Sequence, residues 1–208
     1  MKKITKWFSV MLGCLTVGMM MTSCLGDGDS TNYEEEWKKY QETLLKEMTA
    51  MHGGYSGFVY HMAFNAALDS TAVTWTVVSD TIAVLDNVPI SKVAGFVNTD
   101  SVIQHRLSTA NDVSMRLKIA SYVNATPLTF YVKPEPVNID VVVDDATGEQ
   151  ETWTLNFDSS IDNQYSYGLF SMSSKQLGLR LYPHSLYAGT RLLTYFYNTP
   201  LTWQGVHQ

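Results

Sequence analysis

Five histidines are the side chains of this 208-residue sequence best suited to act as general bases or metal ligands. They are His52, His61, His105, His184 and His207. No two of them are three or four residues apart, as on one face of a helix, or two apart, as on one face of a strand. The sequence therefore predicts no catalytic histidine, no metal ion and no cofactor.

Acidic side chains gather in one predicted turn. They are Asp144, Asp145, Glu149 and Glu151. Solvated turn acids explain the cluster, and weak calcium binding is the alternative, although the spacing is not that of a calcium-binding loop. A glycosidase needs two carboxylates across a cleft, which Asp140 or Asp158 could supply only if the fold brings them together. No nucleophile elbow, phosphate loop or dinucleotide fingerprint is present, so no catalytic residue is predicted.

Aromatic side chains crowd the last quarter of the chain. In residues 193–197, Leu-Thr-Tyr-Phe-Tyr, both faces of a predicted strand are apolar or aromatic, so at least one face needs a cover or a ligand. Core packing is one interpretation, and a platform on which a sugar or peptide stacks is the other. The ligand-stacking candidates are Tyr165, Tyr167, Tyr195, Tyr197 and Trp203.

Residues 1–23 have the order of a secretory signal peptide. Three lysines precede an apolar run over residues 7–21, and two small residues and Cys24 follow. A helix that crosses a bilayer needs roughly twenty apolar residues, so a removed signal is favoured over a retained membrane helix.

Residues 21–24, Met-Thr-Ser-Cys, resemble the lipobox of bacterial lipoproteins, in which signal peptidase cuts on the N-terminal side of the cysteine and the cysteine thiol is acylated. The first lipobox position, usually leucine, is Met21 here. Residues 25–29, Leu-Gly-Asp-Gly-Asp, resemble the acidic tether of Bacteroidota surface lipoproteins. The resemblance implies that Cys24 is lipidated and that acyl chains hold the protein at the outer membrane, facing the periplasm or, as the tether favours, the cell surface.

Cysteine use and charge limit the partners of the exported chain. Cys14 leaves with the signal and Cys24 is lipidated, so the folded domain has neither disulfide nor thiol nucleophile. Without the three signal lysines, the 14 basic residues fall to 11 against 20 acidic ones, and the net charge falls from −6 to about −9. This balance argues against nucleic acid and against anionic lipid headgroups as partners. Membrane contact is expected through the anchor.

Four motifs resemble the O-glycosylation pattern of exported Bacteroidota proteins, in which aspartate is followed by serine or threonine and then by a mostly apolar residue or threonine. This composition gives about one match by chance, so four is a small excess. The predicted acceptors are Ser30, Ser70, Thr81 and Ser101.

The periodicity predicts a helix and then strands. Apolar residues recur at helical spacing over residues 32–51, and we expect this stripe to dock on the domain behind it, with a partner-protein helix as the alternative. From Tyr55 onward the period is two, except between Val88 and Ala110, where two short helices are expected. Strands are predicted near residues 55–62, 73–77, 80–86, 113–120, 127–132, 137–143, 153–157, 165–172, 176–182 and 191–197, with a hairpin turn at 144–149.

The predicted fold class is mainly β: an antiparallel sandwich or partly open barrel with an N-terminal helix and short helical insertions. The predicted organisation is a signal peptide (1–23), a lipidated tether (24–31), a helix (32–53) and an antiparallel β domain (54–208), which could consist of two packed halves that split near residues 123–127. The whole pattern resembles small Bacteroidota lipoproteins of uncharacterised function.

We therefore expect an exported, lipid-anchored lipoprotein that acts as a non-enzymatic binding or accessory module for a protein or glycan ligand. A glycan- or peptide-directed hydrolase is one alternative, which two carboxylates in one cleft would favour. A structural subunit of a surface assembly is another, which an exposed strand edge or a large apolar patch would favour.

Overall fold

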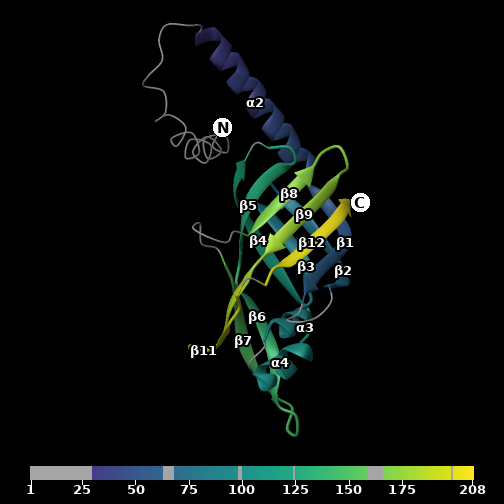
Figure 1. The fold of residues 1–208 in the computed structure, drawn as a ribbon, viewed down its shortest axis with the longest axis vertical. Coiled ribbons are helices and arrows are strands. Elements are labelled where there is room, and N and C mark those ends of the chain that lie inside the picture. Colours follow the sequence, from purple (N-terminus) through teal and green to yellow (C-terminus); the bar gives the residue numbers. More distant parts are fainter. Residues whose placement is uncertain (1–29, 63–67, 98–99, 124, 159–165, 198) are drawn as a thin grey trace, which may run out of the picture. The chain divides into compact units, whose positions relative to one another are not determined.

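The computed structural model describes residues 30–62, 68–97, 100–123, 125–158, 166–197 and 199–208. The chain forms two compact units, Met1–Gln41 and Glu42–Gln208, and the second unit contains all the described strands (Figure 1). The predicted signal peptide and Cys24 lie outside the described residues. None of the helices in the described ranges is long and apolar enough to cross a membrane.

Helix α2 spans Ser30–Ala50, as the helical spacing predicts. Within the second unit its last turns join the core: Met48 is 8% exposed, Met51 is fully buried, and Leu44 is partly buried and packs against the core. The Tyr55 hydroxyl donates a hydrogen bond of 2.7 Å to the Met51 carbonyl. The end of the apolar stripe is thus fixed to the first strand of the β domain.

Twelve strands are present in the described residues. They are β1 (Gly53–Met62), β2 (Leu68–Ser79), β3 (Ile82–Val88), β4 (Val113–Val123), β5 (Leu128–Pro134), β6 (Val137–Asp144), β7 (Glu149–Phe157), β8 (Tyr167–Ser171), β9 (Gln176–Leu181), β10 (Pro183–Ala188), β11 (Arg191–Tyr195) and β12 (Leu201–His207). Between β3 and β4 lie the short helices α3 (Ile90–Val93), η2 (Ala94–Phe96) and α4 (Ser101–Ser108).

Eight strands close an antiparallel barrel in the order β1-β12-β9-β8-β5-β4-β3-β2, and four form a sheet in the order β11-β10-β7-β6 (Figure 1). Hairpin β6–β7 leaves the barrel after β5, hairpin β10–β11 leaves it after β9, and the pairing of β7 with β10 joins the two hairpins. The predicted antiparallel, mainly β architecture with an N-terminal helix is confirmed. Its closure differs from both predicted forms, because β12 pairs with β1 and with β9 and leaves no gap.

Strands β10 and β12 are the two that the periodicity does not predict. In β12, Leu201 and Trp203 are buried in the barrel, but the next inward position is Gly205, which has no side chain to continue the alternation. In β10 the buried residues Ser185 and Leu186 are adjacent, because the register with β7 shifts after Pro183. A search for period two therefore finds neither strand.

Prolines stand where the chain passes between the barrel and the four-stranded sheet. Pro134 ends β5 and Pro136 precedes β6, while Pro183 begins β10 and Pro200 precedes β12. Since proline cannot donate to a strand ladder, it is suited to the first or last position of a strand. The four prolines therefore stand at the points where the chain passes from one sheet to the other.

Two facing glycines bring β1 and β12 close together where the barrel closes. Gly57 and Gly205 are register partners. A Cβ on Gly57 would collide with the Gln204 carbonyl, and one on Gly205 would collide with the indole of Trp75 and lie 2.5 Å from the Ser56 carbonyl oxygen. The close approach of the strands depends on both residues having no side chain.

We expect Gly205→Ala to destabilise the protein by about 1–3 kcal/mol, because the added methyl overpacks the barrel against Trp75. The matched control is Gly178→Ala on β9, whose Cβ would meet only the Trp203 carbonyl oxygen at 3.6 Å. Urea unfolding of both variants is the measurement. Equal unfolding midpoints for Gly205→Ala and the wild type would contradict the packing argument.

Candidate binding site

The outer face of the barrel over β1, β12, β9 and β8 carries side chains in rows that cross the strands. One row consists of Phe58, Gln204, Gly178 and Leu169, each the register partner of the next. Phe58 is 48% exposed and Leu169 is 38% exposed, whereas the neighbours of Gly178 along β9 are buried leucines. The row therefore faces outward.

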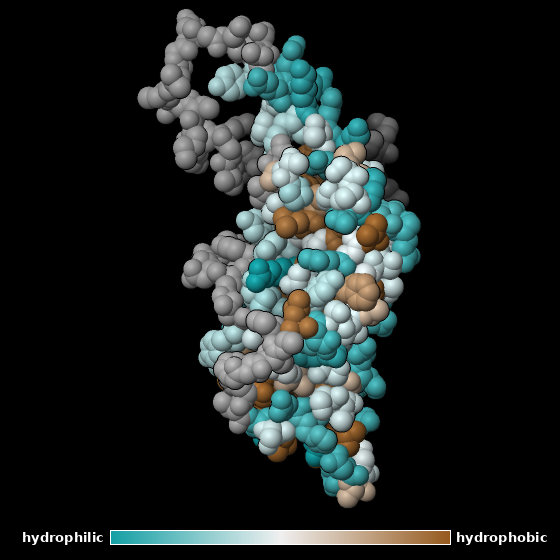
Figure 2. Space-filling view, turned by 45° about the vertical axis from the view of Figure 1, so that its right-hand side comes forward, coloured by the Kyte–Doolittle hydropathy of each residue, from teal (hydrophilic) through white to brown (hydrophobic). Residues whose placement is uncertain are grey.

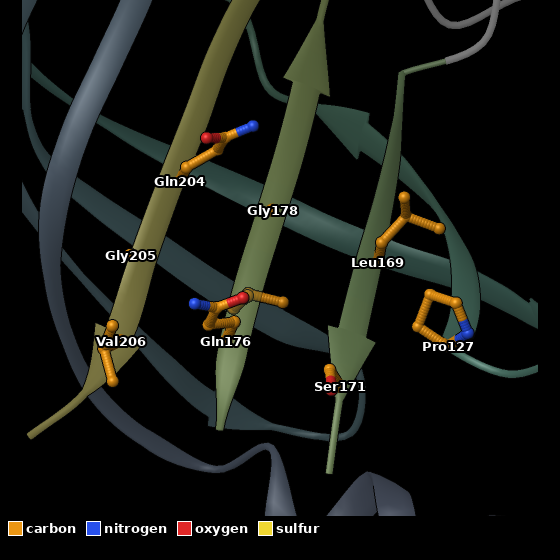
Figure 3. Close-up of a pocket in the computed structure, with 9 residues that line it drawn as sticks. Pro127, Leu169, Ser171, Gln176, Gly178, Gln204, Gly205 and Val206 are labelled. Atoms are coloured by element: carbon orange, nitrogen blue, oxygen red, sulfur yellow. The ribbon is translucent and has the colours of Figure 1, made fainter. Parts of the chain in front are cut away.

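A shallow groove of about 340 Å³ lies on this face (Figure 3). The backbone of Gly178 leaves its floor bare, the Gln176 and Gln204 side chains stand beside that floor, and Leu169 and Pro127 lie across from them. Carboxamides both donate and accept hydrogen bonds, while the two apolar side chains offer a dry surface. A ligand rich in hydroxyls with some apolar area fits this lining.

The next row along the strands is aromatic and cationic. It consists of Tyr60, Thr202, Arg180, Tyr167 and Tyr131, which are successive register partners on β1, β12, β9, β8 and β5. All five side chains are partly exposed. The rings of Phe58 and Tyr60, one from each row, have centroids 6.4 Å apart. The face therefore combines stacking surfaces with hydrogen-bonding groups.

The Arg180 guanidinium carries its charge without a carboxylate partner in the described part of the chain. It lies 5.5 Å from the centroid of the Tyr182 ring. Hydrogen bonding to the Tyr167 hydroxyl is the largest cause that raises the pKa of Arg180 above its ordinary value. Its Nε is buried and has no acceptor. The cation is thus positioned by aromatic groups and left unneutralised.

The sequence interpretation missed Gly178, Arg180 and Gln204. The signal for the first two was present, since the buried Leu177, Leu179 and Leu181 alternate with them and so place both on the outer face. Their proximity to β1 could not be seen, because it depends on the register of strands far apart in the sequence.

The stacking candidates separate in the fold. Tyr167 belongs to the aromatic row, whereas Tyr195 and Tyr197 lie at the end of β11 and beyond it, 44% and 80% exposed, with ring centroids 6.3 Å apart. The assignment of Trp203 was wrong: its side chain is fully buried in the barrel core and cannot stack on a ligand outside. Tyr165 lies outside the described residues.

Strand β11 is one edge of the four-stranded sheet and, within the described residues, pairs only with β10. The opposite edge, β6, is in contact with α4, where Arg106 Nη2 donates to the Val143 carbonyl at 2.7 Å. Leu192 and Tyr195 on β11 are exposed. An apolar strand edge of this kind can accept another strand.

A family model described as "Domain of unknown function (DUF4840)" matches residues 50–188. The chain belongs to this family. A search of curated proteins and a search of solved structures each gave no match. The DUF4840 match runs from the end of α2 to the end of β10, so it includes β8 and β9 of the groove, while β12 lies beyond it.

The five histidines of this DUF4840 protein do not assemble into a site. His52 Nε2 lies 2.7 Å from an oxygen of Asp80, and the His207 ring is hydrogen bonded to the His52 carbonyl at 2.8 Å. His105 and His184 are exposed at separate positions, on α4 and β10. In the described ranges, no group of three or more His, Cys, Asp or Glu side chains could hold a metal ion.

His61 is the histidine that the fold buries, with 5% exposure. Burial lowers its pKa, which the charge of Asp69, 3.6 Å away, opposes. Asp69 also pairs with Lys92 at 2.9 Å, and this hydrogen bond is the main cause that lowers the pKa of Asp69. Charge pairing therefore explains why His61, Asp69 and Lys92 lie together. None of the three residues lines the groove.

The acidic cluster of the DUF4840 chain stabilises its own hairpin. Asp144 accepts a backbone N–H two residues on, which is the main cause that lowers its pKa. Asp145 pairs with Arg106, and Glu151 accepts a hydrogen bond of 2.9 Å from the Trp153 indole. These contacts agree with the interpretation of the acidic cluster as residues that stabilise a turn.

Asp140 and Asp158 do not converge. Asp140 on β6 lies opposite Thr152 on β7. Thr152 in turn precedes Asp158 by six residues along the chain. At about 3.3 Å per residue this corresponds to about 20 Å along the strand. Glycosidase carboxylates stand roughly 5–9.5 Å apart, so these two acids do not form such a pair.

The predicted O-glycosylation acceptors with described side chains are all exposed: Ser70, Thr81 and Ser101. The aspartate before each already has a structural partner: Asp69 pairs with Lys92, Asp80 with His52, and Asp100 caps α4 by accepting two backbone N–H groups. Ser30 is the first residue of α2.

Proposed function

We propose that this DUF4840 protein is an exported, lipid-anchored, non-enzymatic binding module at the cell surface, whose outer barrel face binds a glycan. The observation that carries the proposal is the groove, in which the bare backbone of Gly178 lies between Gln204 and Leu169. An open groove of this kind, bordered by the carboxamides of Gln176 and Gln204 and by the apolar Leu169 and Pro127, suits a chain of sugar rings.

The outer barrel face, which consists of the groove and the aromatic rings of β1 beside it, matches the two kinds of surface that a sugar presents. The apolar faces of sugar rings stack on aromatic side chains such as Phe58 and Tyr60, and their hydroxyls exchange hydrogen bonds with carboxamides such as Gln204. Figure 2 shows one face of the molecule, on which hydrophobic residues form small separate areas among hydrophilic ones. A ligand of mixed polarity suits such a surface better than an apolar one.

The proposed localisation at the cell surface rests on residues 1–29. Their lysines, apolar run and Cys24 favour export and acylation, and the acidic residues after Cys24 favour the cell surface. The acceptors Ser30, Ser70, Thr81 and Ser101 would carry O-linked sugars in that compartment.

Labelling with radioactive palmitate tests the anchor. We expect the wild-type chain to be labelled and to fractionate with membranes, and Cys24→Ala to lose both the label and the membrane association. Cys14→Ala is the matched control, because that residue leaves with the signal, and it should be labelled like the wild type. A labelled Cys24→Ala chain, or an unlabelled Cys14→Ala chain, would contradict the assignment.

A glycan array probed with the full chain in detergent micelles tests the ligand, followed by calorimetry on the hits. We expect Gln204→Ala to weaken binding about tenfold, the loss expected for one or two hydrogen bonds. Gln150→Ala, at an exposed position on β7, is the matched control and should bind like the wild type. Absence of any hit, or equal binding by Gln204→Ala, would refute the glycan site.

The edge strand β11 favours a second candidate function, assembly of a structural subunit. Two copies of an antiparallel edge can pair about a two-fold axis, which would join two four-stranded sheets through β11. The exposed side chains of Leu192 and Tyr195 would then be covered.

Sedimentation velocity over a range of concentrations tests this assembly. We expect a dimer that Leu192→Lys weakens at least tenfold, because a charged side chain on an edge strand opposes pairing. Val78→Lys is the matched control, since Val78 is exposed on a barrel strand that is paired on both edges. A monomer at all concentrations would exclude β11 as a self-association site.

A further inference from the structure

We propose that Arg180 makes the barrel face selective for acidic glycans, those whose sugar units carry a carboxylate. This inference rests on the proposed glycan-binding function and adds the chemical class of the ligand. It is carried by three observations on Arg180: its distance from the groove, its lack of a counter-ion among the described residues, and the aromatic groups that position it.

Arg180 is within reach of a ligand in the groove. It lies two residues beyond Gly178 on β9, on the same outer face, which corresponds to about 7 Å. Thr202 and Tyr167, its register partners on the two neighbouring strands, flank it. The groove itself extends from Gly178 toward Gln176 and Ser171, so a glycan reaches Arg180 where it continues past Gly178 in the opposite direction along β9, within about one sugar unit.

Most other cations of the molecule that are partly buried already have an acid. Lys92 pairs with Asp69, and Arg106 pairs with Asp145. No carboxylate of the described residues pairs with Arg180, although acidic residues outnumber basic ones, 20 to 14. A partly buried charge without a counter-ion is unfavourable, and its buried Nε lacks an acceptor as well. A ligand carboxylate would supply the missing negative charge.

The guanidinium is held in place before a ligand arrives. The centroid of the Tyr182 ring lies 5.5 Å from it, and Tyr167, its register partner on β8, lies beside it. Arginine presents paired N–H donors in a planar fork that matches a carboxylate, so a fixed guanidinium loses little freedom when it binds one. The site therefore favours a carboxylate over a neutral hydroxymethyl group at the same position of a sugar.

The test uses a glycan array that contains uronic-acid and sialic-acid oligosaccharides, the methyl ester of each, and sulfated and neutral oligosaccharides. We expect the full chain to bind a carboxylate-bearing glycan at least tenfold more tightly than its methyl ester. Arg180→Gln should abolish this preference, so that the acid and its ester bind with equal affinity. Arg191→Gln removes the same charge from an exposed position on β11 and should keep the preference.

The variants separate the two proposals. Gln204→Ala should weaken the acid and the ester by the same factor and keep the preference, whereas Arg180→Gln should weaken the acid more than the ester and remove the preference. Binding confined to neutral or sulfated glycans, or an unchanged preference in Arg180→Gln, would overturn the acidic-glycan inference and leave the glycan site standing. If no glycan binds, both proposals are wrong.

Because Arg180 packs on Tyr182, thermal unfolding must show that Arg180→Gln is folded. Arg180→Lys provides the second variant, since it keeps the charge but not the planar fork. We expect Arg180→Lys to retain part of the preference for the acid and to lose it as the salt concentration rises. Full wild-type preference in both variants would refute the role of the guanidinium.

Discussion

The barrel depends on the pairing of its last strand with its first. β12 forms ladders with β1 on one side and β9 on the other, and no other described strand fills that place. The facing glycines Gly57 and Gly205 let the two backbones approach and leave room for the indole of Trp75. The other ladder of β12, with β9, builds the groove, because it sets Gln204 beside Gly178. The strand that closes the barrel therefore also forms one side of the groove.

Local sequence patterns predicted most of the strands but not how they close. Alternation such as Leu177-Gly178-Leu179-Arg180-Leu181 identifies a half-buried strand and assigns its two faces. It does not indicate which strand lies next to it. The neighbours of Arg180 are Thr202 and Tyr167, and Tyr60 lies one strand further, so the aromatic row exists only through pairings between distant parts of the chain. Gly205 in β12 and the register shift in β10 removed the local signal at the strands that complete each sheet.

The polar groups of the structure divide into two kinds. Asp100 caps a helix, Asp144 closes a turn, and Asp69 and Asp80 pair with Lys92 and His52, so each is explained by the stability of its own segment. The sequence interpretation treated acids and histidines as the residues to examine for chemistry, whereas the fold uses them for caps, turns and pairs. The groups of the barrel face, Gln176, Gln204 and Arg180, attract no attention in a sequence because their types are common and their spacing is that of any strand.

The order of the strands along the chain also has a consequence for the synthesis of the protein. β12 follows every other barrel strand, so until it is made β1 and β9 have no neighbour on one side and show bare N–H and C=O groups along that length. Unpaired edges of this kind invite association between chains. A chain that crosses a membrane unfolded postpones this hazard until its last residues have arrived. Any product that stops before Leu201 would keep both edges exposed, and such a fragment is a natural substrate for chaperones and proteases.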